Sequence, residues 1–179
     1  KETLQAQSDR LLKVYTNSKF YLRFKEILGI FDACFRKYLV GQCTEAVILG
    51  ALCALGMMIF KFPYAVMIGT LIGFTALIPV AGAYIGAAVG AIMILTVSPV
   101  QSLLFLVFIV VLQQIEGNLI YPKVVGSSLG LPALWVLAAV TIGGGVMGIP
   151  GMLLGVPISA ALYRLIKQDV LKKEAKQNS

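Results

Sequence analysis

The sequence contains no histidine, and charged side chains make up only 13% of its 179 residues. Soluble domains usually contain about 25% charged residues, so this chain has too little polar surface for a soluble fold. Without histidine it also lacks the commonest metal ligand. The three cysteines, Cys34, Cys43 and Cys53, follow neither a metal-ligand spacing nor a disulfide framework. We therefore expect no metal, no cofactor and no enzyme active site, and we interpret the cysteines as small apolar side chains.

Charge is missing altogether from two long stretches, residues 62–115 and 124–163. Both are long enough for more than one membrane span of about 20 residues. Hydrophobic segments are expected at about 44–60, 63–79, 81–97, 100–120, 133–149 and 150–166. The predicted fold class is all-α, a polytopic transmembrane helical bundle with four or six crossings.

The net charge of +7 comes from the two ends of the chain. Residues 1–42 hold eight Lys or Arg against four Asp or Glu, and residues 164–179 hold five against two. The positive-inside rule then places both ends in the cytoplasm. We divide the chain into a basic amphipathic segment at 1–42, cytoplasmic or lying in the membrane interface, a transmembrane domain at 43–166 and a basic cytoplasmic tail at 167–179. The absence of interleaved aromatic and basic residues argues against nucleic-acid binding.

Proline and glycine interrupt the apolar segments. The predicted helix breaks are Pro79, Gly82, Pro150, Gly151 and Pro157. Segments 63–97 and 133–166 are therefore expected to be broken helices or re-entrant hairpins. Each contains an Ile-Pro pair, a pattern that marks binding sites in some transporters, although chance could also produce it. Glycines spaced four apart predict close helix packing; they are Gly69/Gly73, Gly82/Gly86/Gly90, Gly144/Gly148 and Gly151/Gly155.

A polar cluster lies between the two uncharged stretches, in QQIEGNLIYPKVVG, residues 113–126. On a helix, Gln113 shares a face with Glu116, and Gln114 shares one with Asn118. Gly117 is expected to allow close approach to the carboxylate, and Pro122 to end the helix.

A carboxylate at the bilayer centre costs about 2.5–3.5 kcal/mol on insertion scales, and the apolar run before Glu116 offsets that cost. Insertion therefore does not explain why the glutamate is there. Glu116 could be a proton- or cation-exchanging group in a translocation path. It could instead pair with Lys123 and fix a helix end, or lie at the membrane interface, which suits a lysine next to a proline.

The motif QxxEGNxxxPKxxG, with the GLP segment after it and the ending PGMLLGVP, resembles the autoinducer-2 exporter family, and the resemblance covers about residues 38–166. It implies a bacterial multi-pass permease of the cytoplasmic membrane, oligomeric, with about the first half of the family's length absent from this chain. The family block falls on Gln113, Glu116, Gly117, Asn118, Pro122, Lys123 and Gly126. Where many members carry histidine this chain has Leu131, so no mechanism that needs that imidazole is carried over.

The resemblance implies export of a small quorum-sensing signal, autoinducer-2 or a similar solute. Some members are assigned sodium(lithium)/proton antiport, which is the alternative function, and a non-transporting membrane scaffold is a further one. The expected partners are a small-molecule or ion substrate, the lipid bilayer and further copies of the chain. Glu116 is the candidate coupling group, with Gln113, Gln114 and Asn118 as polar lining.

Overall fold

The computed structural model describes residues 18–126 and 130–177. In this part of the chain every regular element is helical: α2 (Ser18–Ile59), α3 (Ala65–Ala76), α4 (Ala81–Leu95), α5 (Pro99–Ile115), the π-helices η1 (Glu116–Ile120) and η2 (Pro122–Gly126), and α7 (Ala133–Gln177). The prediction of an all-α fold is confirmed. Each expected hydrophobic segment coincides with one of these helices or with one arm of α7.

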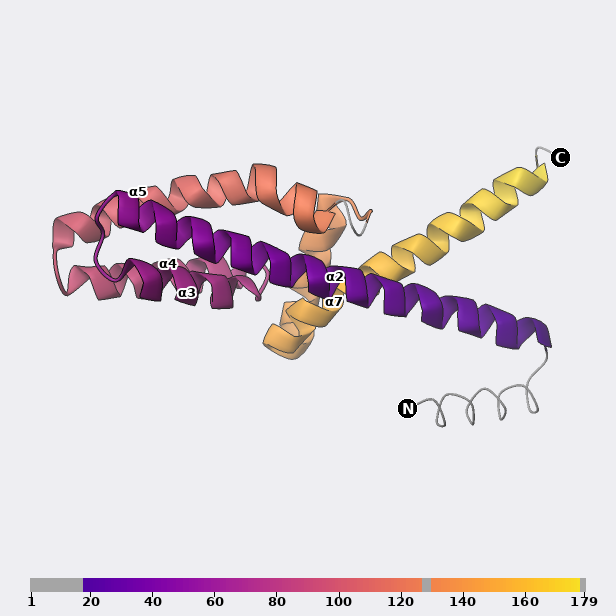
Figure 1. Ribbon diagram of the computed structural model, residues 1–179. Helices are drawn as coiled ribbons and strands as arrows, with labels where there is room; N and C mark the ends of the chain where they lie inside the picture. Colours follow the sequence, from indigo (N-terminus) through magenta and orange to yellow (C-terminus); the bar gives the residue numbers. More distant parts are fainter. Residues whose placement is uncertain (1–17, 127–129, 178–179) are drawn as a thin grey trace, which may run out of the picture.

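The inner half of α2 packs beside α3, α4 and α5, with neighbouring helices antiparallel (Figure 1). Their shared core contains Leu49, Cys53, Ile72, Ile94 and Phe105, all buried. A second core joins the middle of α2 to η2 and α7, through residues such as Cys34, Val140 and Val156. The two cores therefore lie one after the other along α2. Cys34 and Cys53 are core side chains as expected, whereas Cys43 is exposed.

The α3–α4 turn, residues 77–80, reverses the chain at the predicted break. Val80 has a φ of 65° and a ψ of −58°, and the Ala81 N–H donates to the Pro79 carbonyl at 2.7 Å. This is the γ-turn with positive φ, which is rare and strained. Directly after it the backbones of α3 and α4 touch, because a Cβ on Gly82 would lie 1.7 Å from the Thr75 oxygen.

The second reversal divides α7 into two arms at Gly148, where φ is 63° and ψ is −139°. Glycine tolerates this conformation. The arms pack through backbone contact, since a Cβ on Gly151 would lie 1.9 Å from the Gly143 oxygen. The break thus lies at Gly148, two residues before the expected position at Pro150. Pro150 itself lies in the first turn of the second arm, where a helix accepts proline. Pro157 lies buried within the second arm, so the expected break there is wrong.

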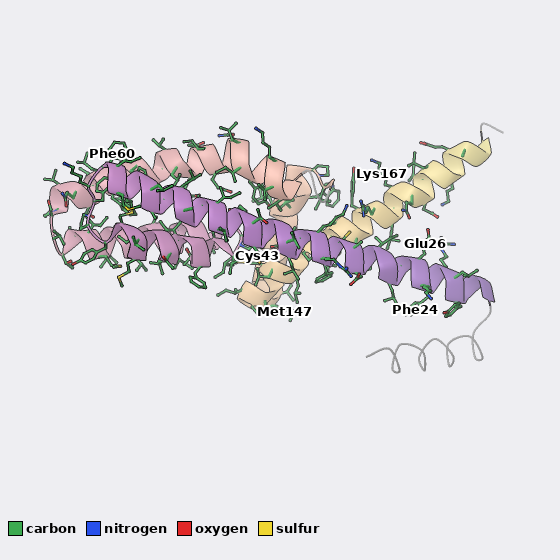
Figure 2. All side chains as sticks on the ribbon, in the orientation of Figure 1. Phe24, Glu26, Cys43, Phe60, Met147 and Lys167 are labelled. Atoms are coloured by element: carbon green, nitrogen blue, oxygen red, sulfur yellow. The ribbon has the colours of Figure 1, made fainter. Side chains whose placement is uncertain are left out.

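Among the described residues, three helical stretches are long and apolar enough to cross a membrane, Tyr21–Ile59, Pro99–Val125 and Leu134–Ala175, while α3 and α4 are shorter apolar helices. The chain is therefore part of a multi-pass membrane protein. The outer ends of α2 and α7 project on the same side of the bundle (Figures 1 and 2). An exposed ion pair joins them, with Arg23 Nη2 3.3 Å from Asp169 Oδ1. The proposed boundary between residues 42 and 43 lies inside the unbroken α2.

Candidate functional site

A stripe of buried side chains runs along α2 from Cys34 to Met57, and it includes the polar residues Gln42 and Glu45. The stripe consists of Cys34, Tyr38, Gln42, Glu45, Leu49, Cys53 and Met57, spaced three or four residues apart. Gln42 and Glu45 are each only 3% exposed, and they lie where the two cores meet. A polar group in such a place costs free energy unless it finds partners.

The partners come from the end of α5. The α-helix stops at Ile115 and the chain continues as η1 and η2, a wider turn that often occurs at functional sites. Pro122 therefore does not end the helical path, because it begins the second π-helical stretch. η2 rests against α2 at Gly41, where a Cβ would lie 3.3 Å from the Val124 oxygen. This contact brings η1 alongside Gln42 and Glu45.

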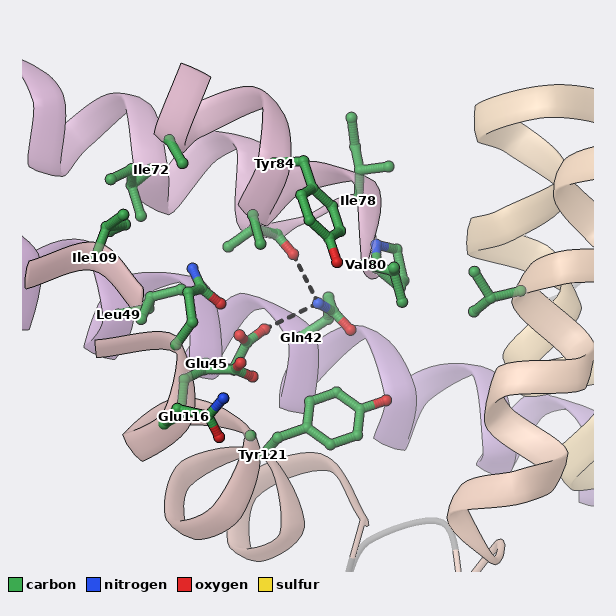
Figure 3. Close-up of a pocket in the computed structure, with 18 of the residues that line it drawn as sticks. Gln42, Glu45, Leu49, Ile72, Ile78, Val80, Tyr84, Ile109, Glu116 and Tyr121 are labelled. Atoms are coloured by element: carbon green, nitrogen blue, oxygen red, sulfur yellow. Dashed lines mark hydrogen bonds between the residues drawn. The ribbon is translucent and has the colours of Figure 1, made fainter. Parts of the chain in front are cut away.

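The carboxyl group of Glu116, the first residue of η1, lies next to that of Glu45 on α2, and both residues line one cavity (Figure 3). An ionised carboxylate can only accept a hydrogen bond, so the two groups can bond to each other only when one of them holds a proton. Two close carboxyl groups exchange their protons as a pair rather than singly. We call Glu45 and Glu116 the carboxyl pair.

Gln42 connects the carboxyl pair to the α3–α4 turn. Its amide Nε2 donates to Glu45 Oε2 and to the Ala76 carbonyl, each at 2.9 Å (Figure 3). The last carbonyls of a helix have no donor within the helix. Pro79 lies three residues after Ala76 and has no N–H to offer, and Val80 has left the helical conformation. The side chain of Gln42 takes their place.

These groups line a cavity of about 520 Å³, a size that suits a small molecule. Its polar end is formed by Gln42, Glu45, Gln113 and Glu116. Most of the remaining wall is apolar and comes from α2 to α5, the α3–α4 turn and the first arm of α7. Tyr84 and Tyr121 also face the cavity (Figure 3).

Two buried polar atoms in the lining have no hydrogen-bond partner among residues 18–126 and 130–177. They are the acceptor Gln42 Oε1 and the donor Gln113 Nε2. A third such atom is the hydroxyl of Tyr38, one helical turn before Gln42. Buried polar groups in proteins are nearly always paired with protein, water or ligand. Two residues of the cavity lining, Gln42 and Gln113, thus hold one acceptor and one donor that no described group satisfies.

Four of the predicted site residues, Gln113, Gln114, Glu116 and Gly117, line the cavity. Of the predicted helix breaks, Pro79 lines it too, while Gly82 and Gly151 act in helix packing. The place of the missing Cβ of Gly117 is open, apart from its chain neighbours and its own helix, and its expected role beside the carboxylate remains a prediction.

Asn118 and Lys123 lie elsewhere, on exposed parts of η1 and η2. Asn118 does not line the cavity. Its Nδ2 donates to Gln114 Oε1 at 3.3 Å, as the helical spacing of the two residues predicted. The suggested pairing of Glu116 with Lys123 remains a prediction. Pro122 and Gly126 mark the two ends of η2.

Sequence reasoning missed Gln42 and Glu45. The signal was present, since both occupy the apolar stripe of α2 at helical spacing. The proposed boundary after residue 42 divided that stripe and hid it. No group of three or more His, Cys, Asp or Glu that could hold a metal ion is found among the described residues.

The family model described as "AI-2E family transporter" matches residues 9–170. Two relatives from Bacillus subtilis (strain 168), named "Putative transport protein" YrrI and YueF, are each 34% identical to the chain. The alignments cover 70% of this chain and 35% of YrrI, and 73% of this chain and 37% of YueF. The protein sll0060 of Synechocystis is 30% identical over 76% of this chain and 39% of its own length. The chain thus spans well under half the length of these relatives. No solved structure gives a significant match.

Proposed function

Because the chain belongs to the AI-2E transporter family, we propose that it forms part of a proton-coupled exporter of a small organic solute, such as an autoinducer-2-like signal. The solute would pass through the cavity between α2, α5 and the α3–α4 turn. The protein would reside in the bacterial cytoplasmic membrane as a homo-oligomer, with both ends of this chain in the cytoplasm.

The observation that carries the proposal is the meeting of the Glu45 and Glu116 carboxyl groups at the polar end of the cavity. The two residues come from different helices, so a proton shared between them would hold α2 and η1 together. If both groups were ionised, their like charges would repel in a partly dry site. Release and uptake of a proton would therefore move the two walls of the cavity relative to each other.

The unpaired atoms favour an organic solute. A hydroxyl group can donate to Gln42 Oε1 and accept from Gln113 Nε2, and both atoms are buried in the lining. The apolar remainder of the wall suits a carbon skeleton. A bare cation could bind Gln42 Oε1 but would leave the Gln113 amide without a partner.

Sodium(lithium)/proton antiport is the second candidate function. Two carboxyl groups and the free oxygen of Gln42 gather at one place, and hard cations prefer oxygen ligands. A sodium or lithium ion could displace the shared proton there. The same two glutamates would then serve both functions, so substrate competition is needed to separate them.

The test uses inverted membrane vesicles that contain the full-length protein, with a pH-sensitive dye inside them. Autoinducer-2, sodium and lithium are added separately, and Glu45→Gln and Glu116→Gln are compared with the native protein. Glu174→Gln is the matched control, because it makes the same change at an exposed position outside the cavity.

We expect autoinducer-2 to trigger proton movement in the native protein and in Glu174→Gln, and in neither cavity variant. Proton movement with sodium or lithium alone would establish the antiporter instead. Uptake of the organic solute that is equal in all four proteins would refute coupling through the pair. Absence of any transport by the native protein would leave the membrane scaffold as its function.

A further inference from the structure

We propose that Gln42 is a positioning residue that transmits the protonation state of the carboxyl pair to the α3–α4 turn. Its amide nitrogen bonds both to Glu45 and to the end of α3. The inference takes the pair as the proton-exchanging group of the proposed function.

The amide of Gln42 is held in a fixed position. Gln42 is 3% exposed, so its side chain has little freedom to exchange partners for water. Both N–H groups of its amide are used, one on each side, at 2.9 Å. A displacement of the Glu45 carboxyl group therefore stretches one bond or carries the amide away from Ala76.

The α3–α4 turn is strained. Val80 is a β-branched residue held at a φ of 65°, a conformation that persists only where surrounding contacts enforce it. Ile78, Pro79 and Val80 all line the cavity. The bond from Gln42 to Ala76 fixes the end of α3 directly before this strained turn. Loss of the bond would free the turn to relax and change the shape of the cavity wall.

The charge of the carboxyl pair decides which of its two partners Gln42 follows. When the shared proton leaves, the two carboxylates repel and Glu45 becomes the stronger acceptor, because hydrogen bonds to ionised groups are about twice as strong as neutral ones. The amide of Gln42 then follows Glu45 rather than the neutral carbonyl of Ala76. Deprotonation of the pair is thus converted into release of the turn.

Other titratable groups near the pair are phenols: Tyr38 on α2, Tyr121 between η1 and η2, and Tyr84 on α4. The lining side chains of α3, α5 and α7 contain no titratable group. Phenols carry no charge below about pH 9. The carboxyl pair is accordingly the group that changes charge at this place between acidic and neutral pH.

The experiment is hydrogen–deuterium exchange, measured by mass spectrometry on the full-length protein in lipid nanodiscs without substrate. The peptide of interest covers residues 77–82, where the Ile78 N–H donates to Thr75 and the Gly82 N–H donates to Ile78. A pH series from about 4 to 9 brackets carboxyl titration in proteins, and rates are corrected for the intrinsic pH dependence of exchange. Gln42→Met preserves the shape of the side chain and removes both bonds. Gln114→Met is the matched control, since Gln114 lines the same cavity but accepts from Asn118.

In the native protein and in Gln114→Met, corrected exchange in the turn should rise as the pH rises. In Gln42→Met, exchange in the turn should be fast at every pH. At low pH its rate should exceed the native rate about tenfold, which corresponds to the loss of one buried hydrogen bond. Exchange in Gln42→Met that equals the native rate would overturn the proposal. A raised rate that keeps the full native pH dependence would also overturn it, because Gln42 would then be a structural clamp only.

A second variant guards against misfolding of Gln42→Met. Pro79→Ala supplies an N–H three residues after Ala76, which can take over its carbonyl. We expect slower exchange in the turn and a weaker pH dependence, and an unchanged pH dependence would contradict the coupling. Because no substrate is present, these outcomes are separate from transport. If the vesicle assay fails while the exchange results hold, the proposed function is wrong and the coupling stands.

Discussion

Gly82→Ala should disrupt the contact between α3 and α4. The added Cβ would lie 1.7 Å from the Thr75 carbonyl oxygen and 2.4 Å from the Thr75 carbonyl carbon. Carbon and oxygen normally approach no closer than about 3.3 Å, so the two helices would have to separate by roughly 1.5 Å. Both clashing atoms belong to the backbone and cannot rotate away.

A gap of about 0.5–1 Å already forfeits a quarter to a half of each dispersion contact. Neighbouring contacts such as that of Gly86 with Ile72 would weaken as well. We therefore expect Gly82→Ala to lower the free energy of unfolding by about 3 kcal/mol, the upper part of the range for overpacked interiors.

The assay is thermal unfolding of the purified full-length protein in one detergent, with loss of the monodisperse peak on size exclusion as the readout. Gly29→Ala is the matched control, because it lies in α2 with nothing within 4 Å of the added Cβ. The control should be more stable by about 0.5–1 kcal/mol, the helix propensity difference. A Gly82→Ala protein as stable as the native one would refute the packing of the α3–α4 turn described above.

Three further predictions use the same unfolding assay. Val80→Gly removes the strain of a positive φ, so we expect it to gain about 1 kcal/mol, and a loss of stability would mean that Val80 is unstrained. Gln113→Leu removes a buried donor without a partner, so stability should rise by about 1 kcal/mol while solute affinity falls; unchanged affinity would show that the solute does not touch it. Arg23→Ala breaks an exposed ion pair and should change stability by less than about 0.5 kcal/mol; a larger loss would show that the outer ends of α2 and α7 depend on it.

Much of the fold follows from the sequence because lipid imposes strong rules on it. The lack of charge marked the spans, and Ile-Pro pairs marked two of the chain reversals, the α3–α4 turn and the one within α7. The second reversal is at Gly148 rather than at Pro150, since proline fixes one angle but does not itself turn the chain. The positive φ that reverses the chain falls on the nearest glycine before it.

The site was predictable only in part, because hydrophobic patterns do not reveal which helices meet. Glu116 stood out as an isolated charge, and its neighbours Gln113 and Gln114 line the same cavity. Its partner Glu45 lies 71 positions earlier, and sequence spacing contains no information on that contact. Asn118 was assigned to the lining because helical spacing places it beside Gln114; that contact is present, but only Gln114 lines the cavity.

The central claim is that Glu45 and Glu116 share one proton and act as a unit in transport. It is tested most directly by the pH dependence of solute transport in proteoliposomes for Glu45→Gln, Glu116→Gln and the double variant. Groups that act as one unit give strongly non-additive effects. The account predicts that each single change abolishes the pH dependence and that the double change adds nothing further. Effects of the two single changes that simply add up in the double variant would contradict it.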